Sequence, residues 1–177
     1  MQKLLLTLVI ASTLLLAPQV QAKLTMNTDQ AIEFVAGVMD GVIQKDNLKE
    51  IKLCISDVKT ISNEVQEIAQ DIMTLEMPKM IEGVMKFMEL LQQYKGSLTQ
   101  CEAIRPDVER FMKFGEVFLH PADLINRVTT NLPAHLNEIM SDVQAAKHDL
   151  SLGNFFSAGE NFGETIVLAI GQVQMTQ

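Results

Sequence analysis

The chain has 177 residues, of which 47% are hydrophobic and 20% are charged, and its 22 acidic and 14 basic residues give a formal net charge of -8. The length indicates one domain, and the composition excludes a collagen-like chain, a chain dominated by Pro and Gly, and a disordered chain. The acidic balance argues against nucleic acid as a partner, because a protein that binds the phosphate backbone needs clustered Lys and Arg.

Residues 1–22 have the pattern of a secretory signal peptide. Lys3 supplies a positive charge, Leu4 to Ala17 is uncharged, and Val20 and Ala22 place small residues before a cleavage site. The apolar run is shorter than the roughly 20 residues that span a bilayer. We therefore expect a signal peptide at 1–22, a secreted helical domain at 23–177, and no transmembrane anchor after cleavage.

Cys54 and Cys101 are the two cysteines. In an oxidising compartment such a pair most simply forms one disulfide, which would close a loop of about 47 residues and stabilise the chain by about 3–4 kcal/mol. Free buried thiols and an intermolecular bridge are the alternatives.

Two helices are predicted in the first half of the chain. Thr28 and Asp29 are typical of a helix start, and the apolar spacing that follows predicts a helix over 28–44. Gly37 and Gly41 are four residues apart on it, which indicates close packing against another backbone. A seam of nearly heptad period then predicts one long helix of about 30 residues. The seam consists of Leu48, Ile51, Ile55, Val58, Ile61, Val65, Ile68, Ile72 and Leu75.

Proline and glycine divide the middle of the chain into shorter helical segments. After Pro78, an apolar stripe predicts a helix over 80–94 that ends at Gly96. Helical spacing resumes until Pro106, which should break or kink the chain. A further helical run over 108–118 ends at His120, and Pro121 is expected as the first residue of the next helix.

Two more helices are predicted towards the C-terminus. Asn131 to Pro133 is expected to separate a helix over 122–130 from a helix that runs to about Leu150. A last helix is expected over 154–171, with Gly159 and Gly163 again four residues apart. No segment alternates strictly or contains a hairpin dipeptide between β-branched residues. The fold class is therefore predicted to be all-α, a single-domain bundle of six or seven helical segments with one long heptad-like helix.

The sequence carries none of the usual signatures of catalysis. It has no Gly-x-x-x-x-Gly-Lys-Ser/Thr loop, no Gly-x-Gly-x-x-Gly, no His-Glu-x-x-His and no Gly-x-Ser-x-Gly. His135 and Glu138 share a helical face, but a carboxylate metal centre in a bundle needs Glu-x-x-His twice and two further Glu residues. We therefore expect no enzyme, no cofactor and no metal centre.

Methionine and phenylalanine mark the candidate binding region. Thioethers fill irregular cores, line adaptable grooves for an apolar ligand or partner, or bind Cu(I). Core filling is the most general role for both residue types, although the adjacent Phe155 and Phe156 cannot both point inward at ideal helical spacing. The methionines that crowd one region, and that would line a ligand groove, are Met73, Met77, Met80, Met85 and Met88.

The stretch from Gly153 to Glu164 reads Gly-Asn-Phe-Phe-Ser-Ala-Gly-Glu-Asn-Phe-Gly-Glu. With the predicted signal peptide, the helical body and the two sparse cysteines, it resembles the tails of uncharacterised secreted all-helical proteins of ciliated protists. The resemblance covers this C-terminal stretch alone and implies no activity.

Two function classes follow. The first is a secreted non-catalytic binding module that holds an apolar ligand or partner in a groove lined by Met and Phe. The second is a secreted structural or protein-interaction protein with a filled core and no small-molecule ligand. A pocket of several hundred Å³ with mainly apolar walls would favour the first class, and a tightly packed interior would favour the second.

Overall fold

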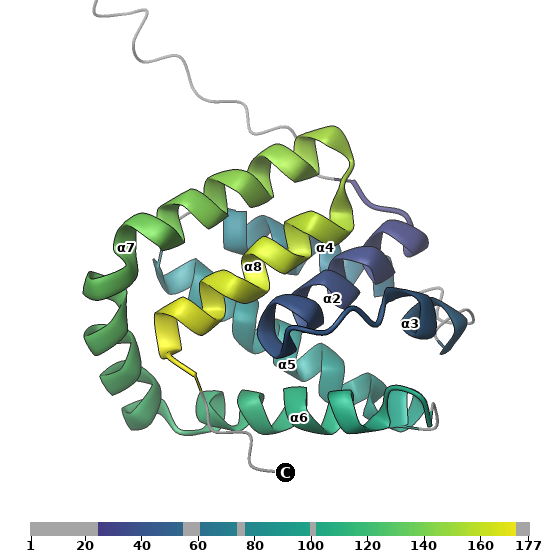
Figure 1. Cartoon of the computed structure of the whole chain (residues 1–177), viewed down its shortest axis with the longest axis horizontal. Coiled ribbons are helices and arrows are strands. Elements are labelled where there is room, and N and C mark those ends of the chain that lie inside the picture. The colour runs from purple at the N-terminus through teal and green to yellow at the C-terminus, as the bar shows by residue number, and fades with distance from the viewer. Residues whose placement is uncertain (1–24, 55–60, 74–76, 100–101, 173–177) are drawn as a thin grey trace, which may run out of the picture.

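The computed structural model describes residues 25–54, 61–73, 77–99 and 102–172, and this part of the chain consists of helices without strands (Figure 1). The all-α prediction is therefore confirmed. The elements are α2 (Thr28–Ile43), α3 (Leu48–Cys54), α4 (Ile61–Met73), α5 (Met77–Thr99), α6 (Arg105–Gly115), the 3-10 helix η1 (Glu116–Leu119), α7 (Pro121–Leu152) and α8 (Phe155–Ile170).

Helix α2 is the central helix, and 11 of its 16 residues are buried. It begins with a capping box at Asn27, one residue before the predicted cap: the Asn27 side chain accepts from the Gln30 backbone N at 3.0 Å, and the Gln30 side chain accepts from the Asn27 backbone N at 2.9 Å. It ends where Gln44 adopts a left-handed conformation with φ 55°. A helix that is apolar on nearly all sides must be enclosed by other elements, and α2 contacts α3, α4, α6 and α8.

Four glycines let α2 and α8 pack with their backbones in contact. Gly37 and Gly41 face the backbone of α8, and Gly159 and Gly163 face the backbone of α2. A Cβ atom on Gly41 would lie 2.8 Å from the backbone N of Glu164, closer than real Cβ contacts come. The close packing expected from the two glycine pairs is therefore confirmed, and each pair packs against the helix that carries the other pair.

Aromatic side chains fill the core on both sides of this contact. Phe34 of α2 and Phe162 of α8 stack with ring centroids 6.3 Å apart. A second cluster joins α5, α6 and η1, in which neighbouring rings are 5.9 to 6.5 Å apart and meet edge-on or tilted, as aromatic pairs prefer. Its members are Phe87, Phe111, Phe114 and Phe118.

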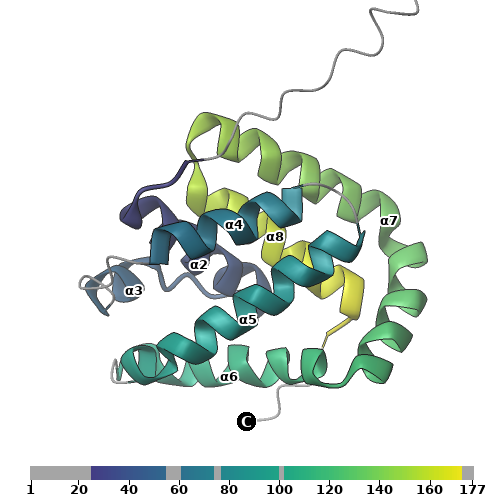
Figure 2. The ribbon, with the colours of Figure 1, turned by 180° about the vertical axis from the view of Figure 1, so that it is seen from behind.

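The predicted heptad-like seam does not form one long helix. Its described parts are two shorter helices, α3 and α4, which run in different directions (Figures 1 and 2). Ile51 of α3 and Val65 and Ile68 of α4 are buried, so the seam does face the core. The periodicity correctly marked the buried positions, but it is a local property and carries no information on where the chain changes direction.

The longest helix is instead α7, with 32 residues, and the predicted break at Pro133 is wrong. Figures 1 and 2 show α7 bending partway along its length, so that it wraps around the end of α8. Proline inside a helix removes one hydrogen bond and crowds the preceding turn, and it can kink a helix without ending it. The hydroxyls of Thr129 and Thr130 donate to the carbonyls of Ile125 and Asn126, each at 2.8 Å, which also favours bending.

Two further predicted boundaries are corrected. Helix α5 begins before Pro78 and continues past Gly96 to Thr99. The predicted break near Pro106 is confirmed: the turn at 102–104 precedes α6, and Pro106 lies in the first turn of this helix, where its missing N–H costs nothing. Pro121 does start α7, as predicted.

One buried carboxylate holds the loop after α2 against α6. The Asp107 side chain, in the first turn of α6, is 4% exposed and forms an ion pair with Lys45. Arg110 lies 3.6 Å from the same carboxylate. A negative charge at this position is also favoured by the partial positive charge of the helix N-terminus.

The glycine contact between α2 and α8 predicts a contrast between two Gly→Ala substitutions. Gly41→Ala should lower the free energy of unfolding by about 3 kcal/mol or more, because the new methyl group meets backbone that cannot move alone. Gly115→Ala should cost clearly less, because its methyl group would meet the flexible end of the Met88 side chain. Urea unfolding measures both, and equal losses would contradict the backbone contact.

Candidate functional site

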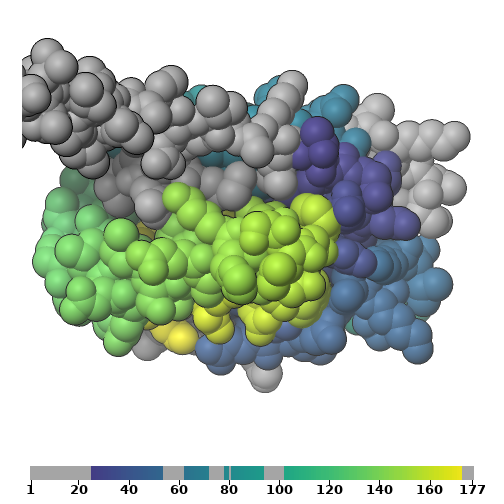
Figure 3. All heavy atoms as spheres, turned by 90° about the horizontal axis from the view of Figure 1, so that it is seen from above, coloured from purple at the N-terminus to yellow at the C-terminus, as the bar shows by residue number. Residues whose placement is uncertain are grey.

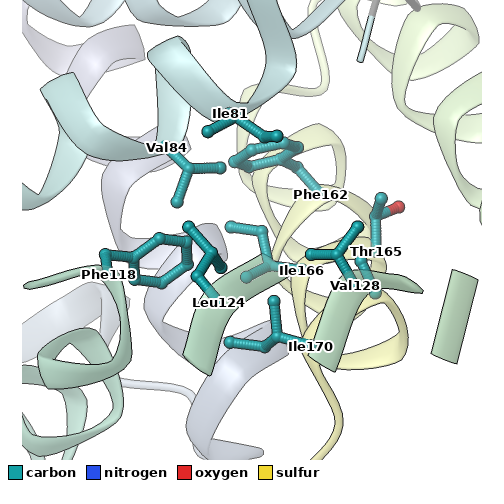
Figure 4. A pocket seen from close by; sticks show the side chains of 10 residues that line it. Ile81, Val84, Phe118, Leu124, Val128, Phe162, Thr165, Ile166 and Ile170 are labelled. Atoms are coloured by element: carbon teal, nitrogen blue, oxygen red, sulfur yellow. The ribbon is translucent and has the colours of Figure 1, made fainter. Parts of the chain in front are cut away.

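The apolar cavity between α5, η1, α7 and α8 has a volume of only about 40 Å³ (Figure 4). Thr165 contributes the one hydroxyl in its lining, and that hydroxyl donates to the Asn161 carbonyl at 3.0 Å. Pockets that take drug-sized ligands have roughly 300–1,000 Å³. The cavity therefore has no room for a lipid. Its lining is Ile81, Val84, Phe118, Leu124, Val128, Phe162, Thr165, Ile166, Ala169 and Ile170.

The two described methionine side chains of the predicted groove differ in exposure. Met85 is 44% exposed, whereas Met88 is buried against Gly115. The side chains of Met73, Met77 and Met80 lie outside the described residues, so the five-residue groove stays a prediction.

The predicted disulfide and signal peptide also stay predictions. The Cys54 side chain and Cys101 lie outside the described residues, as do residues 1–22. The prediction that Phe155 and Phe156 cannot both point inward is confirmed, because Phe155 is buried and Phe156 is only partly buried.

A cleft of about 350 Å³ with mixed polar and apolar walls opens where the end of α2 meets α7 and α8. His135 and Asp142 come from α7, and Glu164 comes from α8, beside Val167 and Leu168. Within the described ranges, no three His, Cys, Asp or Glu side chains are arranged to hold a metal ion. His135 is engaged instead with its neighbour on the helix, its Nδ1 atom lying 3.0 Å from Oε2 of Glu138.

The carboxyl groups around this cleft disfavour one another's charge. Burial, and then repulsion from Asp142 and Asp40, raises the pKa of Glu164. Burial, and then repulsion from Glu138, raises the pKa of Asp142. Burial is also the largest cause of the raised pKa values of Asp40 and Glu160. Repulsion from Asp46 is the next cause at Asp40, and repulsion from Asp40 is the next cause at Glu160. Four carboxyl groups from three helices therefore share one environment.

The sequence pattern alone does not place these acidic residues together. A local signal was present: each of Asp40, Glu160 and Glu164 is the immediate neighbour of a glycine that packs α2 on α8. These neighbours indicate an acidic cluster only if the two glycine pairs pack against each other, which the sequence does not show.

One edge of α7 exposes apolar side chains. Ile125 is 63% exposed, Leu136 is 49% exposed and Met140 is 39% exposed. Leu136 and Met140 are four residues apart on the arm of α7 that follows Pro133, which places them on the same side of the helix, whereas Ile125 lies on the arm before the bend. Seen from above, α7 lies at the surface of the described molecule (Figure 3). Leu136 and Met140 form what we call the α7 apolar edge.

The comparison with protein families identifies the chain. The model of the SctB-like family, described as "Secreted protein B-like", matches residues 15–170. The chain belongs to this family. No curated protein and no solved structure matches it. None of the described helices is long and apolar enough to cross a membrane.

The small cavity predicts how valine substitutions affect stability. Val128→Ile adds one methylene group beside the cavity and should leave stability unchanged or raise it by about 1 kcal/mol. The same change at Val35, which is 1% exposed in packed core, should cost about 1 kcal/mol or more. Thermal unfolding of both variants checks this. A loss at Val128 as large as that at Val35 would show that the cavity is not free space.

Proposed function

We propose that this Secreted protein B-like family member is a secreted, non-catalytic interaction module that binds a protein partner through its outer surface. The observation that supports this most directly is the filled interior, whose apolar cavity of about 40 Å³ is too small for a lipid. Of the two predicted function classes, the second therefore has the better support.

Secretion is supported by two independent features. Residues 1–22 have the charge, apolar run and cleavage pattern of a signal peptide. The family description also refers to secreted proteins. In the oxidising compartment that such a chain enters, a Cys54–Cys101 disulfide would form, and a mass two hydrogens below that of the reduced chain would establish it.

A non-catalytic role is supported by the sequence and by the family. None of the nucleophile and base motifs considered above is present, and the family description names no reaction. The described core also contains few polar side chains that catalysis would need: Asn47, Asp107 and Thr165 are the buried polar residues of the described part. Each has a hydrogen-bond or ion-pair partner.

We assign partner binding to the α7 apolar edge. Leu136 and Met140 are exposed, and a partner that removed these side chains from water would stabilise the complex. Apolar residues that line up on one outer edge are typical of interaction surfaces, whereas scattered ones are not. The rival hypothesis is an apolar ligand held near Met85 by the predicted methionine groove. The protist resemblance of Gly153 to Glu164 adds no activity to either hypothesis.

The test uses the tagged full chain, secreted by its own cells, and measures the size of the species that contains it in the medium. The wild-type chain should elute in a complex larger than the monomer. Leu136→Lys/Met140→Lys should shift it to the monomer without changing Tm, because both positions are exposed. A wild-type chain that elutes as a bare monomer would overturn the proposal.

The matched control is Asn137→Lys/Ser141→Lys, which adds the same two charges at exposed polar positions of the same helix, each about 100° around the helix from an edge residue. This variant should keep the complex. Native mass spectra before and after organic extraction test the rival hypothesis: an adduct that extraction removes would favour the apolar ligand, and an unchanged mass would exclude it.

A further inference from the structure

The glycine contact forces carboxylates of α2 and α8 together. Asp40 precedes Gly41, whose missing side chain lets the Glu160 carbonyl and the Glu164 backbone N approach α2. Glu160 and Glu164 each follow a glycine on α8 that approaches α2 in the same way. Because backbone packing fixes these positions in the chain, a shift of one helix cannot separate the acidic residues without breaking the glycine contact.

Helix α7 adds acidic groups to the same junction. Asp142 lines the cleft beside Glu164, and Glu138 repels Asp142. Asp46, in the loop after α2, and Asp149 of α7 act on Glu160 in the same sense. The junction of α2, α7 and α8 therefore collects negative charge from all three helices.

Cations near the junction do not neutralise it. Lys45 forms its ion pair with Asp107 of α6. His135 contacts Glu138. Among the described residues, neither these nor Lys147 of α7 forms an ion pair with the four carboxylates at the centre of the junction. The four carboxylates are Asp40, Asp142, Glu160 and Glu164.

We propose that the junction of α2, α7 and α8 is a pH-sensitive joint that is tight when its carboxylates are protonated in mild acid and looser when they are ionised at neutral pH. The inference is independent of the proposed partner binding. Helix α8 would then be held more firmly in an acidic compartment than in a neutral one.

Linkage between proton binding and folding determines the direction of the pH effect on stability. Burial and mutual repulsion raise the pKa of each of the four carboxyls, so the folded chain binds these protons more tightly than the unfolded chain. The contribution to stability is then fully present below the ordinary carboxyl pKa of about 4 and is lost as the pH rises through the raised values.

Hydrogen exchange of the full secreted chain at about pH 4.5 and about pH 7.5, corrected for intrinsic rates, tests the joint. In the wild type, amides of α8 should be better protected at the lower pH, because the raised carboxyl pKa values make the folded chain bind these protons more tightly than the unfolded chain. Glu160→Gln/Glu164→Gln removes both charges and should give α8 the same protection at both pH values. Asp142→Asn tests the joint from α7 and should reduce the difference.

The matched control is Glu109→Gln/Glu116→Gln, which removes two charges at exposed positions of α6 and η1. This variant should keep the pH dependence of the wild type. Equal protection of wild-type α8 at both pH values would overturn the proposal, as would a pH dependence that persists in Glu160→Gln/Glu164→Gln. Loss of the dependence in the control variant would reduce it to a general effect of net charge.

Discussion

The close approach of α2 and α8 is the constraint on which the rest of the fold depends. Gly37 and Gly41 on one helix meet Gly159 and Gly163 on the other, and no larger residue fits at these positions. Dispersion and burial reward such contact because the two backbones lose water and gain near neighbours along several turns. Once α2 and α8 are joined, α7 must cover the outer side of α8, and α4 and α6 must cover α2.

The same contact has an electrostatic cost. Glycine positions that bring backbones together also bring their neighbours in sequence together, and here three of those neighbours are the acidic residues Asp40, Glu160 and Glu164. Each carboxyl keeps partial contact with solvent, which weakens the repulsion. The hydrophobic packing of the two helices can therefore outweigh it. The packing of the bundle and its response to pH therefore have one structural origin.

Because the interior of the bundle is filled, a partner would have to bind at its surface. Phe87 and Phe111 pack edge-on between α5 and α6, and the cavity beside α8 is small. The bend near Pro133 lets one long helix cover α8 and continue around its end, which leaves Ile125 and Leu136 on the outside. The proposed partner is a protein, because the acidic net charge of the chain makes nucleic acid a poor candidate.

The sequence by itself determined the all-α class, the extents of α2 and α8 within one or two residues, and the buried side of most helices, because caps and the 3.6-residue period are local properties. It did not determine that the seam beginning at Leu48 would be divided between two helices, or that α7 would continue through Pro133. Whether a proline bends or ends a helix depends on what the following turns can pack against, and α8 supplies that surface. The acidic junction was likewise decided by the tertiary structure, because its carboxylates are distant in sequence and come together when the glycine pairs of α2 and α8 pack against each other.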